Sequence, residues 1–137
     1  MKKICLNENI FYVGVNDRRK HLFENNWPLP KGVSYNSYLI KDTKTALIDT
    51  IEFGSNDNYI NHITALLDGA PLDYLIVNHM EPDHSSMIGT VLHHFPHVKI
   101  VGNAQTHKIL KMYFNIPCES IVTVKDGEVL DLGEHKL

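Results

Sequence analysis

Four side chains able to bind a metal ion fall within six consecutive positions: His79, Glu81, Asp83 and His84. A short apolar run precedes them and a helical pattern follows, so they lie at a strand-to-helix turn. In extended backbone the side chains at i, i+2 and i+4 point the same way, so His79, Glu81 and Asp83 can converge on one point. Pro82 disfavours the helical region for Glu81 and keeps that piece extended. We expect a helix to begin at about His84 and to carry its imidazole beside the other three groups.

The donor set of two imidazoles and two carboxylates suits iron, manganese or zinc and argues against copper(I) or a sulfide cluster. Carboxylates favour a pair of ions, because they can bridge two cations and offset their charge. Adjacent residues such as Asp83 and His84 seldom aim at one ion, which again suggests ligands divided between two metals. The alternative is structural, since Asp83 with Ser85 or Ser86 could simply cap the helix. All four groups together, at a strand end where α/β folds place their sites, favour a metal site.

Length and composition are those of an ordinary globular protein, either one domain or part of one. The 137 residues are 43% hydrophobic and 21% charged, with a formal net charge of −3. This charge gives no reason to expect nucleic acid or an anionic membrane as a partner. No apolar run approaches the length of a membrane span, and polar residues interrupt the N-terminus before a signal core forms, so we expect a cytoplasmic protein. Cys5 and Cys118 are far apart in sequence and are interpreted as free, buried thiols.

The elements that must position the four residues alternate between strands and helices in the middle of the chain, which predicts an α/β layer with a mixed sheet and flanking helices. Strands are expected at 4–6, 10–15, 34–40, 45–49, 72–77 and 98–102, and helices at 57–67, 85–95 and 104–114, the last with Ile109, Leu110 and Tyr113 as its core stripe. Residues 16–32 are expected to form a long irregular loop. Asp126-Gly127 between two β-rich runs predicts a hairpin over 121–132.

The His-x-Glu-x-Asp-His pattern of residues 79–84 resembles the His-x-His-x-Asp-His motif of the metallo-β-lactamase superfamily, with Glu81 in place of the second histidine. That replacement resembles the flavodiiron proteins, or A-type flavoproteins. Residues 27–40, 46–50, 78–85 and 125–128 are also similar to this family, so that the resemblance covers essentially the whole chain.

The resemblance implies an αββα sandwich with a non-haem di-iron site that reduces dioxygen to water or nitric oxide to nitrous oxide. By it, His79 and Glu81 would bind one iron and Asp83 the other, and it leaves open whether His84 binds the second iron or turns away. The family takes its electrons from FMN in a C-terminal flavodoxin-like domain, which a rubredoxin-type donor reduces, and works as a head-to-tail homodimer. We expect residues 1–137 to be a truncated N-terminal metallo-β-lactamase-like domain, the first half of the sandwich. The downstream ligands and the FMN domain are absent, so this chain alone is expected to be inactive.

Two other functions compete with this interpretation. A zinc hydrolase of the same superfamily is disfavoured by Glu81, because a zinc-bound hydroxide generally needs a neutral ligand at that position. The third possibility is a non-catalytic fragment or association module.

The remaining candidate residues carry weaker expectations. His93, His94 and His97 are predicted to be a solvent-facing cluster at a helix end, and His62 and His107 to be surface or partly buried. For His21 and Trp27, in the long loop, the family resemblance implies a place beside the metal pocket, and simple packing of the loop is the alternative. Asp49 is expected to satisfy backbone donors behind the metal loop, and His135 is not assigned to the site.

Overall fold

A seven-stranded mixed sheet organises the chain, which a computed structural model describes for residues 4–114, 116 and 118–137. The strand order is β1-β2-β7-β8-β9-β10-β11, antiparallel from β1 to β8 and parallel from β8 to β11. These strands are β1 (Ile4–Asn7), β2 (Ile10–Tyr12), β7 (Tyr38–Ile40), β8 (Ala46–Ile48), β9 (Tyr74–Ile76), β10 (Lys99–Gly102) and β11 (Ile121–Thr123). Each parallel crossover contains helix, as the alternating pattern predicts.

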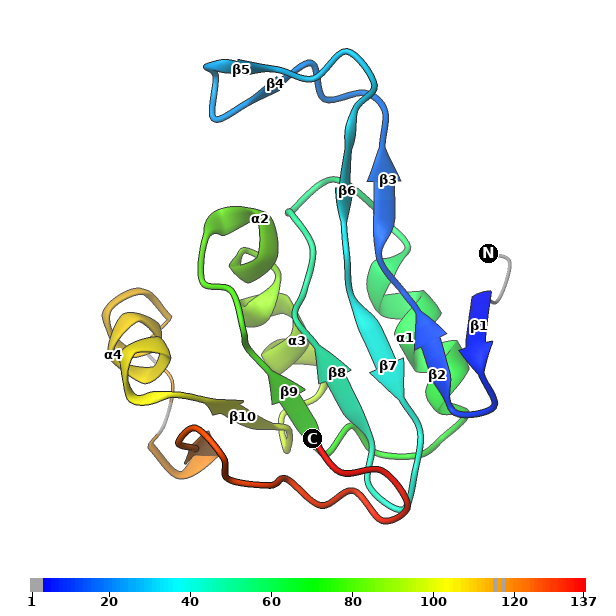
Figure 1. Cartoon of the computed structure of the whole chain (residues 1–137), viewed down its shortest axis with the longest axis vertical. Coiled ribbons are helices and arrows are strands. Elements are labelled where there is room, and N and C mark those ends of the chain that lie inside the picture. The colour runs from blue at the N-terminus through cyan, green and yellow to red at the C-terminus, as the bar shows by residue number, and fades with distance from the viewer. Residues whose placement is uncertain (1–3, 115, 117) are drawn as a thin grey trace.

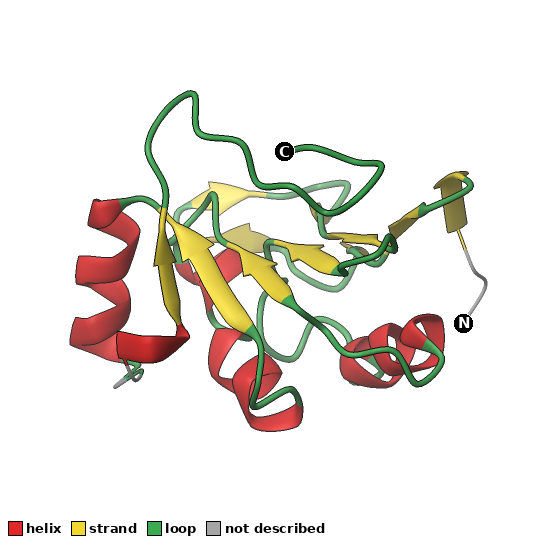
Figure 2. Cartoon of the chain, turned by 90° about the horizontal axis from the view of Figure 1, so that it is seen from below, coloured by secondary structure: helices red, strands yellow, loops and turns green. Residues whose placement is uncertain are grey.

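The helices cover one face of the sheet (Figure 2). They are α1 (Tyr59–Leu67), α2 (Pro82–Ser85), α3 (Ile88–His94) and α4 (Ala104–Tyr113), and a 3₁₀ turn spans Cys118–Ser120. The main apolar core lies between these helices and the sheet, with Leu39, Leu47, Leu75 and Ile100 fully buried. None of the helices in the described part of the chain is long and apolar enough to cross a membrane.

The predicted hairpin over 121–132 is wrong. The turn at Asp126-Gly127 does form, with Gly127 at φ +82, but β11 pairs in parallel with β10. The chain then crosses the face of the sheet opposite the helices (Figure 2), where Leu132 is buried in a small cluster with Ile40 and Ala46. Burial of leucine on an apolar sheet face outweighs the pairing of the two runs as a hairpin there.

The interpretation of 16–32 as an irregular loop is also wrong. Two short antiparallel ribbons form there, β3 (Val15–Asp17) with β6 (Val33–Tyr35), and β4 (Leu22–Phe23) with β5 (Trp27–Pro28). Together they make an arm that projects from the body (Figure 1). Proline is tolerated in such a ribbon because one side of each strand needs no ladder donor. The expected strand over 34–40 is therefore two strands, one in the arm and one in the main sheet.

Two smaller expectations about packing are also corrected. In α4, Thr106, His107 and Leu110 are buried, whereas Tyr113 is 75% exposed, so the buried stripe is rotated from the predicted one. Cys5 is exposed because β1 is an edge strand. The side chain of Cys118 lies outside the described residues.

Candidate metal centre

The candidate metal ligands lie in the turn between β9 and α2, at the carboxyl end of the parallel strands. β8 and β9 run in parallel with Ile48 opposite Ile76, so their carboxyl ends meet at the same edge of the sheet. Asp49 follows β8 and reaches across to this turn. Its Oδ1 accepts hydrogen bonds from the backbone N–H groups of Asn78 (2.7 Å) and His79 (3.1 Å). The expectation that Asp49 satisfies backbone donors behind the turn that carries His79 is confirmed.

The backbone of the turn follows the constraint that Pro82 imposes. Glu81 is extended, with φ −71° and ψ 154°, and Pro82 is the first residue of α2. The helix thus begins two residues earlier than expected, and Asp83 sits in its first turn. No side-chain cap bond forms at this helix start, and Asp83 Oδ1 is buried with no hydrogen-bond partner. Asp83 is therefore not serving as a helix cap.

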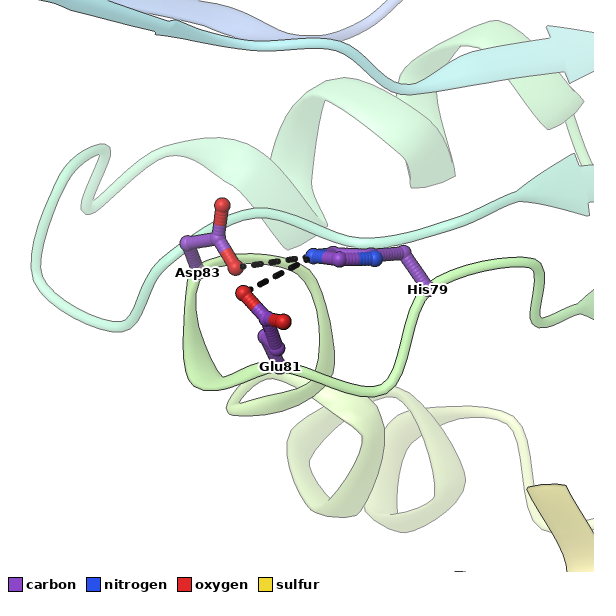
Figure 3. Close-up of side chains that lie close together, drawn as sticks. All are labelled: His79, Glu81 and Asp83. Atoms are coloured by element: carbon purple, nitrogen blue, oxygen red, sulfur yellow. Dashed lines mark ion pairs between the residues drawn. The ribbon is translucent and has the colours of Figure 1, made fainter. Parts of the chain in front are cut away.

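His79, Glu81 and Asp83 converge on one point (Figure 3). His79 Nε2 lies 3.4 Å from Glu81 Oε2 and 3.5 Å from Asp83 Oδ1, and the three donor atoms all lie within 4.8 Å of one another. Two ligands about 2.1 Å from one ion, at a tetrahedral angle, would be about 3.4 Å apart. Among the described residues, no other group of three or more His, Cys, Asp or Glu side chains has this geometry.

The convergence has a different origin from the predicted one. The prediction placed all three residues in extended backbone, whereas Asp83 comes from the first helical turn and meets His79 across an i, i+4 separation. The side chains of His79 and Glu81 are 45% and 62% exposed, and that of Asp83 is 15% exposed. The group is therefore closed behind Asp83 and open on the side of Glu81.

His84 is close to this group but held differently. Its ring stacks edge-to-face on that of His79, with centroids 5.4 Å apart, and its Nε2 is 3.9 Å from Asp83 Oδ2. Its Nδ1 lies 3.0 Å from the carbonyl oxygen of Thr50. A carbonyl only accepts, so Nδ1 carries a proton, and in the neutral ring Nε2 then has the lone pair that a metal needs. Ligating histidines in proteins commonly make this kind of outer hydrogen bond.

Asp83 thus presents one oxygen to each imidazole, Oδ1 toward His79 and Oδ2 toward His84. The buried Oδ1, which receives no hydrogen bond, and the mixed oxygen and nitrogen donors fit a hard or borderline cation such as ferrous iron. The donor set is thus compatible with the iron that the sequence pattern suggests.

Tyr35 and Glu52 complete the surroundings of His84, and sequence reasoning did not assign either of them to the site. Tyr35 is fully buried and packs edge-to-face on His84, with ring centroids 6.2 Å apart. Its hydroxyl donates to Glu52 Oε2. Burial, and then this hydrogen bond and the charge of Glu52, raise the pKa of Tyr35 well above its usual range, so the phenol stays protonated.

The structure places the other histidines outside the candidate centre. His93 and His94 are exposed at the end of α3 and His97 is exposed just after it, as expected. His62 is partly buried, as expected. His107 is buried and its Nδ1 lies 2.8 Å from Thr123 Oγ1, so the expectation of a surface or partly buried position fails for His107. His135 is bonded to Asp42 through both its backbone N–H and its Nδ1.

The two residues of the arm singled out in the sequence, His21 and Trp27, are both exposed, and the Trp27 side chain is 66% exposed at the end of the arm.

An apolar pocket of about 480 Å³ adjoins the exposed side of the candidate ligands, next to Glu81. Met80, Glu81 and Pro82 line it from the turn, and Ile109, Tyr113 and Phe114 line it from α4 and its end.

Comparisons with known proteins identify the relatives of this chain. Residues 33–137 match the model of a family described as "ODP family beta lactamase". The chain is 34% identical over 137 residues to a flavo-diiron protein of Clostridium acetobutylicum, covering all of this chain and 34% of that protein. It is 31% identical over 134 residues to an anaerobic nitric oxide reductase flavorubredoxin of Vibrio vulnificus, covering 97% of this chain and 27% of the other.

Solved structures agree with these sequence relatives. The rubredoxin oxygen:oxidoreductase of Desulfovibrio gigas matches with a TM-score of 0.89 and 27% identity, over 98% of this chain and 34% of that one. A flavoprotein of Thermotoga maritima matches with a TM-score of 0.86 and 31% identity, over 98% of this chain and 34% of that one. The expected fold, the first half of a metallo-β-lactamase-like sandwich, is confirmed. The chain spans about a third of the length of these relatives.

Proposed function

We propose, for a chain that belongs to the ODP β-lactamase family and corresponds to the N-terminal part of flavodiiron proteins, a role in metal binding. In this proposal the chain supplies the first ligands of a non-haem di-iron site. The observation that carries the proposal is the convergence of His79, Glu81 and Asp83, with Asp83 Oδ1 buried, without a hydrogen bond and 3.5 Å from His79 Nε2. A buried carboxylate oxygen without a hydrogen-bond donor is costly unless a cation or another donor completes it.

Following the family pattern, we assign His79 and Glu81 to one iron. Asp83 would hold the other through Oδ2, which lies toward His84, while its Oδ1 lies beside His79. His84 joins Asp83, since its Nε2 lies 3.9 Å from Asp83 Oδ2 and its Nδ1–H is already engaged by Thr50. When bound, a ferrous pair supplies adjacent coordination sites and two electrons for a diatomic gas.

The chain's own residues prepare that chemistry. Glu81 and Asp83 provide negative charge that offsets the two cations. Thr50 holds His84 as the tautomer with the lone pair on Nε2, and Asp49 fixes the backbone from which His79 projects. The apolar pocket beside Glu81 adjoins the exposed side of the site, where an uncharged gas would approach it.

For the whole protein that contains this chain, we propose reduction of dioxygen or nitric oxide in the cytoplasm. The names of the relatives support this, because they include a nitric oxide reductase flavorubredoxin and a rubredoxin oxygen:oxidoreductase. By the same relation we propose FMN in a flavodoxin-like domain as the immediate source of electrons, a rubredoxin-type donor and a homodimer. Residues 1–137 would then be the N-terminal part of the metal-binding domain, without the downstream ligands.

The metal content of the chain tests this proposal. The chain is reconstituted anaerobically with ferrous iron alone and, in a separate sample, with zinc alone, because zinc displaces ferrous iron from most protein sites when the two are mixed. Each sample is desalted and analysed for bound metal, alongside H79A and D83A. We expect iron bound in the wild type and lost in both variants, with H93A, a change at an exposed histidine away from the site, as the matched control. Zinc with hydrolytic activity would instead indicate the zinc hydrolase. No retained metal would indicate a fragment that does not bind metal.

A further inference from the structure

The imidazole of His84 is fixed by groups far away in the sequence. Its Nδ1–H donates to Thr50 O at 3.0 Å, and its backbone carbonyl accepts from the Thr50 N–H at 3.2 Å and from the Thr50 hydroxyl. The edge-to-face contact with the buried Tyr35 ring restricts rotation on another side. The orientation of His84 therefore depends on where the loop after β8 and the base of the arm lie.

Glu52 links these two elements. It lies two residues beyond Thr50 in the loop after β8, and its carboxylate accepts two hydrogen bonds, from the Tyr35 hydroxyl at Oε2 and from Lys20 Nζ at Oε1. The side chains of Glu52 and Lys20 are only 27% and 21% exposed. The Lys20 ammonium also lies over the ring of Tyr35, 5.8 Å from its centroid. One carboxylate thus joins the loop, the arm and the ring that packs on His84.

We infer that Glu52 is a positioning residue for the metal centre: held by Tyr35 and Lys20, it fixes the loop and the aromatic ring that orient His84. This inference rests on the proposed metal site, because it treats His84 as a ligand. Glu52 itself contacts none of the proposed ligands directly. Its effect travels through Thr50, whose carbonyl engages His84 Nδ1, and through Tyr35.

The inference makes a prediction that a merely structural role would not. Outer partners that orient a ligating histidine typically contribute about 10- to 100-fold to metal affinity. We therefore expect E52A to weaken binding of Co²⁺, a spectroscopic substitute for iron, by about tenfold. E52Q keeps an acceptor for the Tyr35 hydroxyl but loses the charge that holds Lys20, so a smaller loss is expected.

A double-mutant cycle tests whether Glu52 acts through His84. Co²⁺ is titrated into the whole chain and into E52A, H84A and the double variant, with E8A, a change at an exposed glutamate between β1 and β2, as control. We expect E52A to have no further effect once His84 is absent, because residues that act as a unit are not additive. An equal loss in both backgrounds would overturn the inference, as would no loss at all in E52A. If E52A does not fold, K20M replaces it in the cycle, because Lys20 is the less buried of the two side chains that donate to Glu52.

A metal-free measurement separates this inference from the proposed function. Long-range ¹H–¹⁵N spectra report which imidazole nitrogen of His84 carries the proton. We expect Nδ1–H in the wild type and E8A, and a mixture of tautomers in E52A. A chain that binds no Co²⁺ but shows this change would refute the metal site, while still supporting the effect of Glu52 on the orientation of His84. An unchanged His84 tautomer in E52A would refute the positioning role whatever the metal result.

Discussion

Replacing Asp49 tests how the metal loop is held. D49A removes the acceptor of two backbone hydrogen bonds, from Asn78 at 2.7 Å and His79 at 3.1 Å. Hydrogen bonds to a charged group contribute about 1.5–3 kcal/mol each, and these are partly exposed to solvent, so the lower value applies and the pair accounts for about 3 kcal/mol. Asp49 also has φ +50°, a region that aspartate tolerates better than alanine, which adds up to about 1 kcal/mol.

We therefore expect D49A to lower the free energy of unfolding by about 3–4 kcal/mol, measured by urea denaturation. D49N keeps a neutral acceptor and should lose about half as much. The matched control is D68A, because Asp68 has φ +52° at the end of α1 without a comparable pair of side-chain bonds. D68A should then lose only about 1 kcal/mol.

The difference in free energy of unfolding between D49A and D68A shows whether the two bonds to the Asp49 carboxylate hold the loop. If D49A costs no more stability than D68A, the two bonds to the carboxylate do not hold the loop and the reasoning is wrong. Metal affinity gives a second measurement on the same variants. D49A should weaken Co²⁺ binding about tenfold, because it frees the backbone from which His79 projects, whereas D68A should leave the affinity unchanged.

Three further predictions follow from other parts of the structure. E81H should raise the ratio of zinc to iron affinity, since it replaces a carboxylate by a neutral imidazole; competition binding measures this, and an unchanged ratio would contradict the role given to Glu81. Hydrogen bonds from the His135 backbone and ring hold the pKa of Asp42 well below its usual range, so their stabilisation is complete above the unfolded pKa of about 3.9 and is lost as pH falls through the lower folded value. D42N should make the urea midpoint of unfolding depend less on pH over that acidic range. An identical pH dependence in the wild type and D42N would refute the assignment. G14A should destabilise by about 1–3 kcal/mol or more, because a Cβ there would lie 2.2 Å from Tyr35 O; a melting temperature equal to that of the wild type would show that the backbone can move apart at this point.

Much of the candidate site could be predicted from the sequence because its causes are local. The approach of His79 and Glu81 follows from their spacing and from the restriction that Pro82 places on Glu81, whereas Asp83 joins them from the first helical turn. The predicted start of the helix was two residues late, since proline at the first helical position removes an N–H that would be unpaired in any case.

The pairing of the last strand could not be predicted in the same way. Asp126-Gly127 forms the turn that its residue types favour, yet the chain after it covers the opposite face of the sheet instead of pairing with β11. The choice depends on whether β10 or a local hairpin partner is available, and on where Leu132 finds an apolar surface. Neither is encoded within a few residues of the turn.

By itself, the sequence determined the donor types, their order, the mixed α/β layer and the place of the metal group at a strand end. Only the tertiary structure decided that His84 donates to Thr50, 34 residues away. It also decided that Tyr35 packs on His84 and that Glu52 accepts hydrogen bonds from Tyr35 and Lys20. Spacing and proline act through neighbouring backbone, so they can be inferred from the order of residues alone. The surroundings of His84 come from three segments that meet only when the parallel strands and the arm are assembled, and the choice among possible pairings is made by packing of the whole chain.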